Sequence, residues 1–153
     1  MNKVYRHIPL ARDEYIGKVK ENGKVFQGRL GPGRMVGHVD LDSGKVYENR
    51  LGPDKNIGRV DLESGEVFLS KLGPDEYIGK VQRDGKCYYH KSLAKDDYVG
   101  KISEMTSLAH GGAGYLLLIL PRIEYVKDLA DQKAEQEKIQ EEMDENLDGL
   151  ETA

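Results

Sequence analysis

The apolar positions of the chain recur in a short step that repeats five times. Each step consists of an aliphatic residue, a glycine, a basic residue or histidine, and a second aliphatic residue, as in Ile16-Gly17-Lys18-Val19. The glycines of the five steps lie 20 or 21 residues apart, at Gly17, Gly37, Gly58, Gly79 and Gly100. A fixed period of this length is typical of a repeat protein, and we interpret the chain as an array of repeats of about 21 residues.

Each repeat carries the pattern of a β-hairpin. Six or seven residues after the step, a second glycine follows Asn, Asp or Ser, at Gly23, Gly44, Gly65 and Gly85. These dipeptides supply the positive φ angle that a tight hairpin turn requires. Beyond the turn, an apolar residue precedes an aromatic one, in Val25-Phe26, Val46-Tyr47, Val67-Phe68 and Cys87-Tyr88. The pattern therefore predicts two short strands joined by a tight turn.

The two ends of the repeat region hold complementary halves of a hairpin. Val4-Tyr5 matches a second strand that has no first strand, and Gly100-Lys101-Ile102 matches a first strand that has no second. Pairing these two strands would close the array and remove its free edges. We therefore predict a mainly β fold, a closed five-fold ring of β-hairpins over residues 1–104, in which the terminal hairpin is split between the N-terminal and C-terminal strands.

Side chains alternate between the two faces of a strand, and this divides the apolar residues of the repeats into sets. Two sets are expected to face inward and share one core: Val4, Val25, Val46, Val67 and Cys87, and Val19, Val39, Val60, Val81 and Ile102. The aromatic residues face the other way and should pack between neighbouring hairpins: Tyr5, Phe26, Tyr47, Phe68 and Tyr88. A third apolar ring is predicted beneath the connectors: Leu10, Leu30, Leu51, Leu72 and Leu93.

These features resemble the bacterial four-fold and five-fold β-flower proteins, which are small rings of glycine-punctuated β-hairpins. The resemblance rests on the five aliphatic-Gly steps, the Asn/Asp/Ser-Gly turns and the apolar-aromatic pairs, and it covers about two-thirds of the chain. It implies the architecture of a hairpin ring. It implies no particular activity, because the family is mostly without assigned function.

Residues 105–121 form an uncharged segment that is rich in glycine and leucine. One interpretation is a Gly-Ala turn at residues 111–114, followed by a buried strand or helix that docks on the open end of the ring; the resemblance favours this packing role. A second is a membrane-associated or re-entrant segment over residues 105–120, since the 17 uncharged residues 105–121 lie at the lower edge of the length that spans a bilayer. A third is a self-association surface.

Residues 122–153 have the composition of a helix and carry most of the negative charge. They hold 4 basic and 11 acidic residues, a net charge of −7, whereas residues 1–121 carry +3. Spacings of four and three residues join Tyr125, Leu129, Gln132, Gln136, Ile139, Met143, Asn146 and Leu150. This heptad pattern has a polar centre, which leaves open a single solvated helix, a weak coiled coil between copies or a docking helix for a partner. Its carboxylates argue against binding to an anionic membrane.

The residue pattern indicates no catalytic, metal or cofactor site. The histidines His7, His38, His90 and His110 lie at no metal-ligand spacing. Cys87 replaces a core valine and is expected to be an inert buried thiol. Turn capping explains the connector aspartates Asp13, Asp54, Asp75 and Asp96. Phosphate-binding loops, nucleophile elbows and paired-carboxylate motifs are absent from the sequence, and we expect no enzyme activity.

A candidate interaction surface can be named from exposure alone. The residue before each aliphatic-Gly step should be exposed by alternation, which would place three tyrosines on one rim of the ring, where they could anchor partners or sugars. The surface comprises these tyrosines and four residues of the tail: Tyr15, Tyr77, Tyr98, Tyr125, Leu129, Ile139 and Met143.

The expected function is that of a non-enzymatic structural or protein-interaction module, with a ring scaffold and a helical tail that binds a protein partner or a second copy. The alternatives are a membrane-associated protein anchored through residues 105–120 and a ring that binds a small ligand or glycan. The net charge of −4 offers no basic footprint for nucleic acid. A single cysteine and no apolar leader after Met1 predict a cytoplasmic protein, with the inner face of the membrane as the alternative location.

Overall fold

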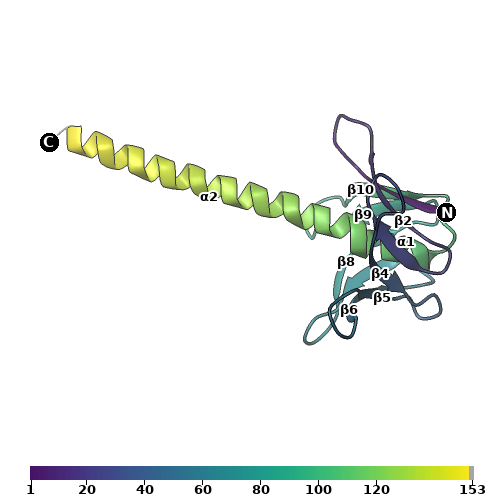
Figure 1. Cartoon of the computed structure of the whole chain (residues 1–153). Coiled ribbons are helices and arrows are strands. Elements are labelled where there is room, and N and C mark those ends of the chain that lie inside the picture. Colours follow the sequence, from purple (N-terminus) through teal and green to yellow (C-terminus); the bar gives the residue numbers. More distant parts are fainter. Residues whose placement is uncertain (152–153) are drawn as a thin grey trace. The chain divides into compact units, whose positions relative to one another are not determined.

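In the computed structural model, ten antiparallel strands form a closed barrel around a helix (Figure 1). The structure describes the backbone of residues 1–151 and the side chains of residues 1–124 and 127–146. The strands are β1 (Asn2–Arg6), β2 (Glu14–Val19), β3 (Lys24–Gln27), β4 (Arg34–Val39), β5 (Lys45–Glu48), β6 (Lys55–Val60), β7 (Glu66–Leu69), β8 (Glu76–Val81), β9 (Lys86–Tyr89) and β10 (Asp97–Ser103). The helical segments are α1 (Leu108–Gly114), the π-helix η1 (Tyr115–Ile119) and α2 (Leu120–Glu151). The chain divides into two compact units, Met1–Pro121 and Arg122–Ala153.

The predicted closure of the ring through a split hairpin is confirmed. β1 pairs with β10 on one side, where Val4 lies opposite Ile102, and with β2 on the other. Each of the ten strands thus has two hydrogen-bonded neighbours. The hairpin turns use glycine at positive φ as expected, for example 90° at Gly23. The barrel therefore satisfies the backbone groups that an open array would leave unpaired at its edges.

The core of the barrel is built on a helix in its lumen. The two predicted inward rings of Val, Ile and Cys side chains are confirmed, since all ten residues are at most 4% exposed. They face α1 and η1, and every residue from Leu108 to Leu120 is buried. Two expectations for residues 105–121 were therefore wrong: the segment lies inside the ring rather than on its open end, and its Gly-Ala stretch is helical rather than a turn.

The barrel and the helix fit together because the small residues of each element lie opposite large residues of the other. The first half of the helix holds Gly111, Gly112 and Gly114, and a Cβ atom at Gly114 would lie 2.9 Å from a methyl group of Val4. The second half of the helix holds large side chains, which face the step glycines of the strands. A Cβ atom at Gly17, for example, would lie 2.9 Å from Leu118. At each step glycine, an added Cβ atom would also collide with a backbone carbonyl oxygen of the neighbouring strand. The step glycines are thus required both by strand pairing and by helix packing.

Five consecutive residues of η1 each contact a different repeat. The pairs are Tyr115 with Gly79, Leu116 with Gly58, Leu117 with Gly37, Leu118 with Gly17, and Ile119 with Gly100. An α-helix turns by about 100° per residue, which is too much to advance one repeat of a five-fold ring at each residue. The π-helix is wider, with i to i+5 hydrogen bonds such as that from Leu120 N–H to Tyr115 O, and it turns less per residue. We infer that the five-fold ring stabilises the π-helical geometry.

A polar cluster fixes the chain where it turns from β10 into the lumen. Asn2 is fully buried, and its side-chain oxygen accepts a hydrogen bond of 2.6 Å from Thr106 N–H. Ser107 caps α1, and its hydroxyl lies 2.7 Å from Nδ1 of His110. Nε2 of His110 lies 3.0 Å from the carbonyl of Glu21. A carbonyl only accepts, so Nε2 carries the proton and Nδ1 accepts from Ser107.

Candidate interaction surface

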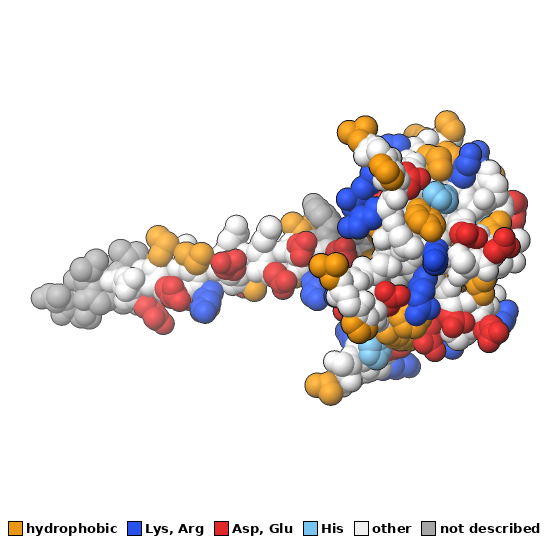
Figure 2. All heavy atoms as spheres, turned by 90° about the horizontal axis from the view of Figure 1, so that it is seen from below, with side chains coloured by type: hydrophobic (Ala, Val, Ile, Leu, Met, Phe, Trp, Pro, Cys, Tyr) orange, Lys and Arg blue, Asp and Glu red, His pale blue; other side chains and the backbone are white. Residues whose placement is uncertain are grey.

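The connectors between repeats present a ring of leucines to solvent. Leu10, Leu30, Leu51, Leu72 and Leu93, which we call the leucine rim, are 90–107% exposed. Figure 2 shows hydrophobic side chains that protrude singly from the barrel unit. The prediction of a third apolar ring beneath the connectors is therefore wrong. The physical reason is that η1 and Leu120 already fill this end of the lumen, so the connector leucines have no cavity to occupy.

The leucine rim is retained in all five repeats although its side chains lie in solvent. One position that packs on the outer wall of the barrel has diverged more, since the residue before the step is Tyr15, Met35, Asn56, Tyr77 or Tyr98. Leaving a leucine exposed forgoes about 1.5–3 kcal/mol of burial free energy. Repeated retention of such a residue on a single end of the molecule indicates contact with something outside the chain.

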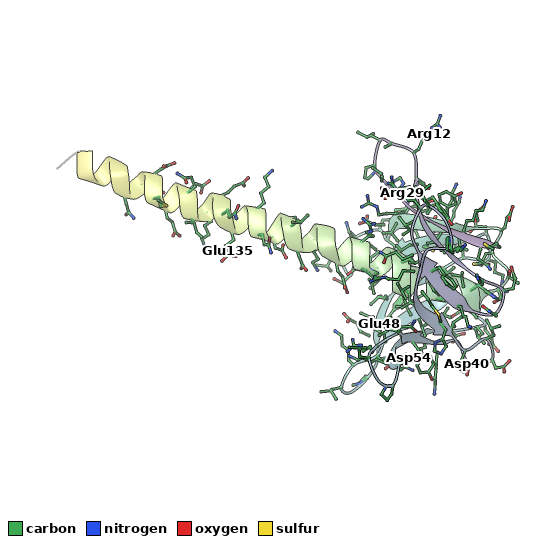
Figure 3. The ribbon with its side chains drawn as sticks, viewed as in Figure 1. Arg12, Arg29, Asp40, Glu48, Asp54 and Glu135 are labelled. Carbon is green, nitrogen blue, oxygen red and sulfur yellow. The ribbon has the colours of Figure 1, made fainter. Side chains whose placement is uncertain are left out.

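Each rim leucine has a basic residue within two positions in the sequence: Arg12, Arg29, Arg50, Lys71 and Lys91. Figure 3 shows Arg12 at the outer end of its loop. Some of these cations have surface carboxylate partners, as in the 2.7 Å pair of Arg29 with Glu14 and the 3.2 Å pair of Arg50 with Glu48. Exposed pairs such as that of Arg50 with Glu48 are worth about 0–1 kcal/mol, so cations of this kind can exchange partners at little cost.

The chain leaves the lumen at the same end of the barrel as the leucine rim. Pro121 borders a hollow of about 340 Å³ together with Gln27, Arg34 and Asn49, which flank two of the connectors. Leu117 of η1 also lines it. The rim therefore surrounds the point at which the polypeptide passes from the barrel unit into the tail.

Glu14 lies between two arginines at this end. Its carboxylate is 3.1 Å from Arg6 and 2.7 Å from Arg29. Hydrogen bonds from Arg29 and then from Arg6 hold the pKa of Glu14 below its ordinary value of 4.5. The folded state thus favours the ionised form of this residue.

Replacing Glu14 with glutamine should lower the melting temperature at pH 7 but not at low pH. The contribution of ionised Glu14 is present above its unfolded-state pKa and is lost as the pH falls through its lower folded-state pKa. The melting temperatures of Glu14→Gln and the parent should therefore differ at pH 7 and converge as the pH falls well below 4.5. Glu63→Gln, at an exposed turn position, is the matched control. A difference that is undiminished at low pH would contradict the assignment.

The three ring tyrosines lie on the outer wall of the barrel and are half-buried. Their rings pack against aromatic residues of the neighbouring hairpin: Tyr15 on Tyr5 at 5.6 Å between centroids, Tyr77 on Phe68 at 5.7 Å, and Tyr98 on Tyr88 at 5.8 Å. The predicted packing of strand aromatics between hairpins is confirmed for Tyr5, Phe68 and Tyr88. Tyr47 stacks instead on His38 of its own hairpin, at 5.0 Å between centroids. Tyr98 also donates a 3.0 Å hydrogen bond to Asp13, and burial together with this bond raises its pKa.

The tail residues of the candidate surface lie on α2. Leu129, Ile139 and Met143 are 47%, 51% and 54% exposed. Tyr125 lies outside the residues whose side chains the structure describes. Residues 134–146 hold six carboxylates and one lysine. Two of the three aliphatic side chains therefore stand among negative charges.

The cysteine, the strand and connector histidines and the connector aspartates occupy structural positions. Cys87 is fully buried, and burial raises the pKa of its thiol. Three histidines pair with connector aspartates: His7 with Asp13 at 3.0 Å, His38 with Asp54 at 3.5 Å, and His90 with Asp96 at 3.3 Å. Asp96 also accepts a 3.3 Å hydrogen bond from the backbone N–H of Lys91, as expected for turn capping. Among the described residues, no cluster of three or more His, Cys, Asp or Glu side chains could hold a metal ion.

Within the described part of the chain, none of the helices combines the length and the apolar character needed to cross a bilayer. The apolar stretch that raised the question, residues 108–120, is the part of the chain that fills the lumen.

Comparison with known proteins leaves the geometry of the chain itself as the basis for a functional assignment. No family model, no curated protein and no solved structure matches the chain at a significant level.

Proposed function

We propose that the protein is a non-enzymatic interaction module that binds a protein partner through the leucine rim and α2. The observation that carries the proposal is the full exposure of a leucine that all five repeats retain. A partner that covered these side chains would recover part of the roughly 1.5–3 kcal/mol that each leaves unrealised in water. The neighbouring cations would orient the partner and speed its approach.

The barrel supports this proposal because it holds the base of α2 in helical form. Helix formation begins with a costly nucleus, so an isolated polar helix is marginal in water. Residues 108–119 are helical and packed in the lumen, and α2 continues directly from them at Leu120. A partner of α2 would therefore meet a helix whose first turns are already formed, which reduces the ordering cost of binding.

A triple rim variant, Leu30→Ser/Leu51→Ser/Leu72→Ser, tests the proposal. Affinity capture from the source cells, with quantification of the captured proteins, should show a partner whose recovery falls roughly tenfold with this variant, since a few buried leucines amount to more than 1.4 kcal/mol. Leu41→Ser is the matched control, because Leu41 is also an exposed leucine, at 39%, but lies at a hairpin turn. Equal recovery of every protein by all three baits would contradict the proposal.

Membrane association is a second candidate, favoured by the basic residue within two positions of each rim leucine. Aliphatic side chains flanked by cations suit an anionic bilayer surface. In this version the rim contacts the lipid, since residues 108–120 fill the lumen. Flotation with phosphatidylcholine vesicles, with and without phosphatidylserine, tests it: rim-dependent binding only to the anionic vesicles is the expected result.

Three further expectations are kept as proposals. The ring belongs with the β-flower proteins, which its closed set of hairpins supports. The protein is cytoplasmic, which its single cysteine supports. A small ligand would fit best in the hollow of about 340 Å³ beside Leu117, and a titration of candidate ligands against the Leu117→Ala variant would test this.

A further inference from the structure

We propose that the leucine rim binds the acidic part of α2, residues 134–146, of a second copy of this chain. The inference rests on the proposed function and names the partner: one copy supplies the rim and the next copy supplies the helix.

The two surfaces are complementary in charge. The connectors hold eight Lys and Arg against six Asp and Glu over residues 7–13, 28–34, 49–55, 70–76 and 90–97. All six carboxylates are already paired in the structure: Asp13 with His7, Asp54 with His38, Asp75 with Arg59, Asp96 with His90, Glu76 with Lys71, and Asp97 with Lys91. The connectors therefore keep an excess of two cations. Residues 134–146 hold six carboxylates against one lysine. The connectors therefore offer cations to a helix segment that has an excess of anions.

The two surfaces also match in their arrangement of apolar groups. Ile139 and Met143 are four residues apart and thus lie on the same side of α2. Both are about half exposed, at 51% and 54%. Glu135 and Glu142 stand four residues before and three residues after Ile139, on that same side. This face of aliphatic side chains flanked by carboxylates is the counterpart of leucines flanked by cations.

In this proposal the helix comes from another copy. α2 is one continuous helix, and Ile139 lies 18 residues beyond Pro121 within it. That separation corresponds to about 27 Å along a helix axis.

A bilayer is a poorer occupant of the rim than a second copy. The chain leaves the lumen at Pro121, at the rim end of the barrel, and the residues that follow carry a net charge of −7. An anionic surface repels these charges. The same charges are attracted to the connectors of another copy.

An interface between a rim and a helix joins two different surfaces of the same protein. Such head-to-tail contacts produce closed rings or open chains of copies rather than a two-fold dimer. Association should therefore rise with concentration without stopping at two copies, and it should weaken as salt screens the charges.

Sedimentation velocity of the full chain over a series of concentrations tests the association. At low salt we expect species larger than one copy, with a shift back toward the monomer at high salt. Leu30→Ser/Leu51→Ser in the rim and Ile139→Ser/Met143→Ser in the helix should each weaken association about tenfold or more. Leu41→Ser is the matched control for the rim, and Leu129→Ser, outside the acidic segment, is the control for the helix. Thermal melts check that each variant is folded.

Mixing the two double variants gives the sharpest result. The rim variant keeps an intact helix and the helix variant keeps an intact rim, so the mixture should form a one-to-one complex that neither variant forms alone. Association of the rim variant with itself would instead assign the contact to pairing between α2 helices and overturn the proposal. A full chain that is monomeric at all concentrations would also overturn it, while rim-dependent capture of a different protein would leave the interaction module intact. Rim-dependent flotation of the monomer with anionic vesicles would assign the rim to lipid.

Discussion

A chain that ends at residue 104 should fail to fold, whereas a chain that ends at residue 121 should unfold cooperatively. The shorter chain contains all ten strands but lacks the buried residues Leu108–Leu120. Its two inward rings would then face an empty lumen, and a closed barrel cannot collapse to fill such a space. Large-to-small changes in a core already cost about 2–5 kcal/mol for a single residue, so the loss of a whole helix exceeds the typical stability of a small domain.

Thermal melts followed by near-ultraviolet circular dichroism provide the measurement. The chain of residues 1–121 is the matched control, because it preserves the first compact unit intact. Its melting temperature should lie close to that of the full chain, since residues 122–153 form a unit of their own. A cooperative melt of residues 1–104 alone would show that the ring does not need its internal helix.

Gly112→Ala should destabilise the protein, which is the opposite of its effect in an exposed helix. Alanine is favoured over glycine by about 1 kcal/mol in a helix interior. At Gly112, however, the added Cβ atom would collide with the side chain of Val60. Overpacking of a core typically costs about 1–3 kcal/mol, and we expect a loss in that range in urea unfolding.

A double-mutant cycle separates this collision from other effects. Val60→Ala removes the two methyl groups that the new Cβ atom would meet but keeps the Cβ atom of Val60, which the new atom would also meet. It should therefore relieve part of the collision, and the double variant should be more stable than the sum of the two single changes predicts, by at least about 0.5 kcal/mol. Val39→Ala, at the equivalent position of the neighbouring repeat, is the control and should show little coupling. Strict additivity with Val60→Ala would mean that Gly112 is not held against that strand.

The ring could be predicted from the sequence because its signals are local and repeated. The five steps and the turn glycines at residues 23, 44, 65 and 85 define the hairpins. The unmatched halves at Val4-Tyr5 and Gly100-Lys101-Ile102 define the closure, and the structure confirms both. Alternation along each strand then assigns the inward and outward residues.

The helix in the lumen could not be predicted in the same way. The step glycines look like strand punctuation, and their true role depends on residues about 20 to 100 positions away, as in the contact of Gly17 with Leu118. Gly111, Gly112 and Gly114 would weaken a helix in isolation, and their suitability follows only from the space between valines of the barrel. The available signal was that the chain holds two sets of glycines, the step glycines and those of residues 111–114, each of which could lie opposite the large residues that accompany the other set.

The leucine rim was misassigned for a related reason. A leucine repeated in every unit is usually a core residue, and the pattern alone cannot show that the lumen is already full. Exposure also distinguishes the ring tyrosines from the rim leucines, since Tyr15 and Tyr77 are half-buried by aromatic neighbours on the outer wall. The candidate surface therefore moves from the tyrosines to the connectors.

The contact of one η1 residue with each repeat restricts how this protein can evolve. Repeat proteins commonly change length by gaining or losing units, because each unit contacts only its neighbours. Here Tyr115 to Ile119 already match five glycines one for one, so a sixth repeat would have no partner residue and a deletion would leave one without a place. A change in the number of repeats would require a simultaneous change in the helix. The helix therefore restricts the number of repeats to five. Descendants of this chain should diverge in their loops and tail while they keep five repeats.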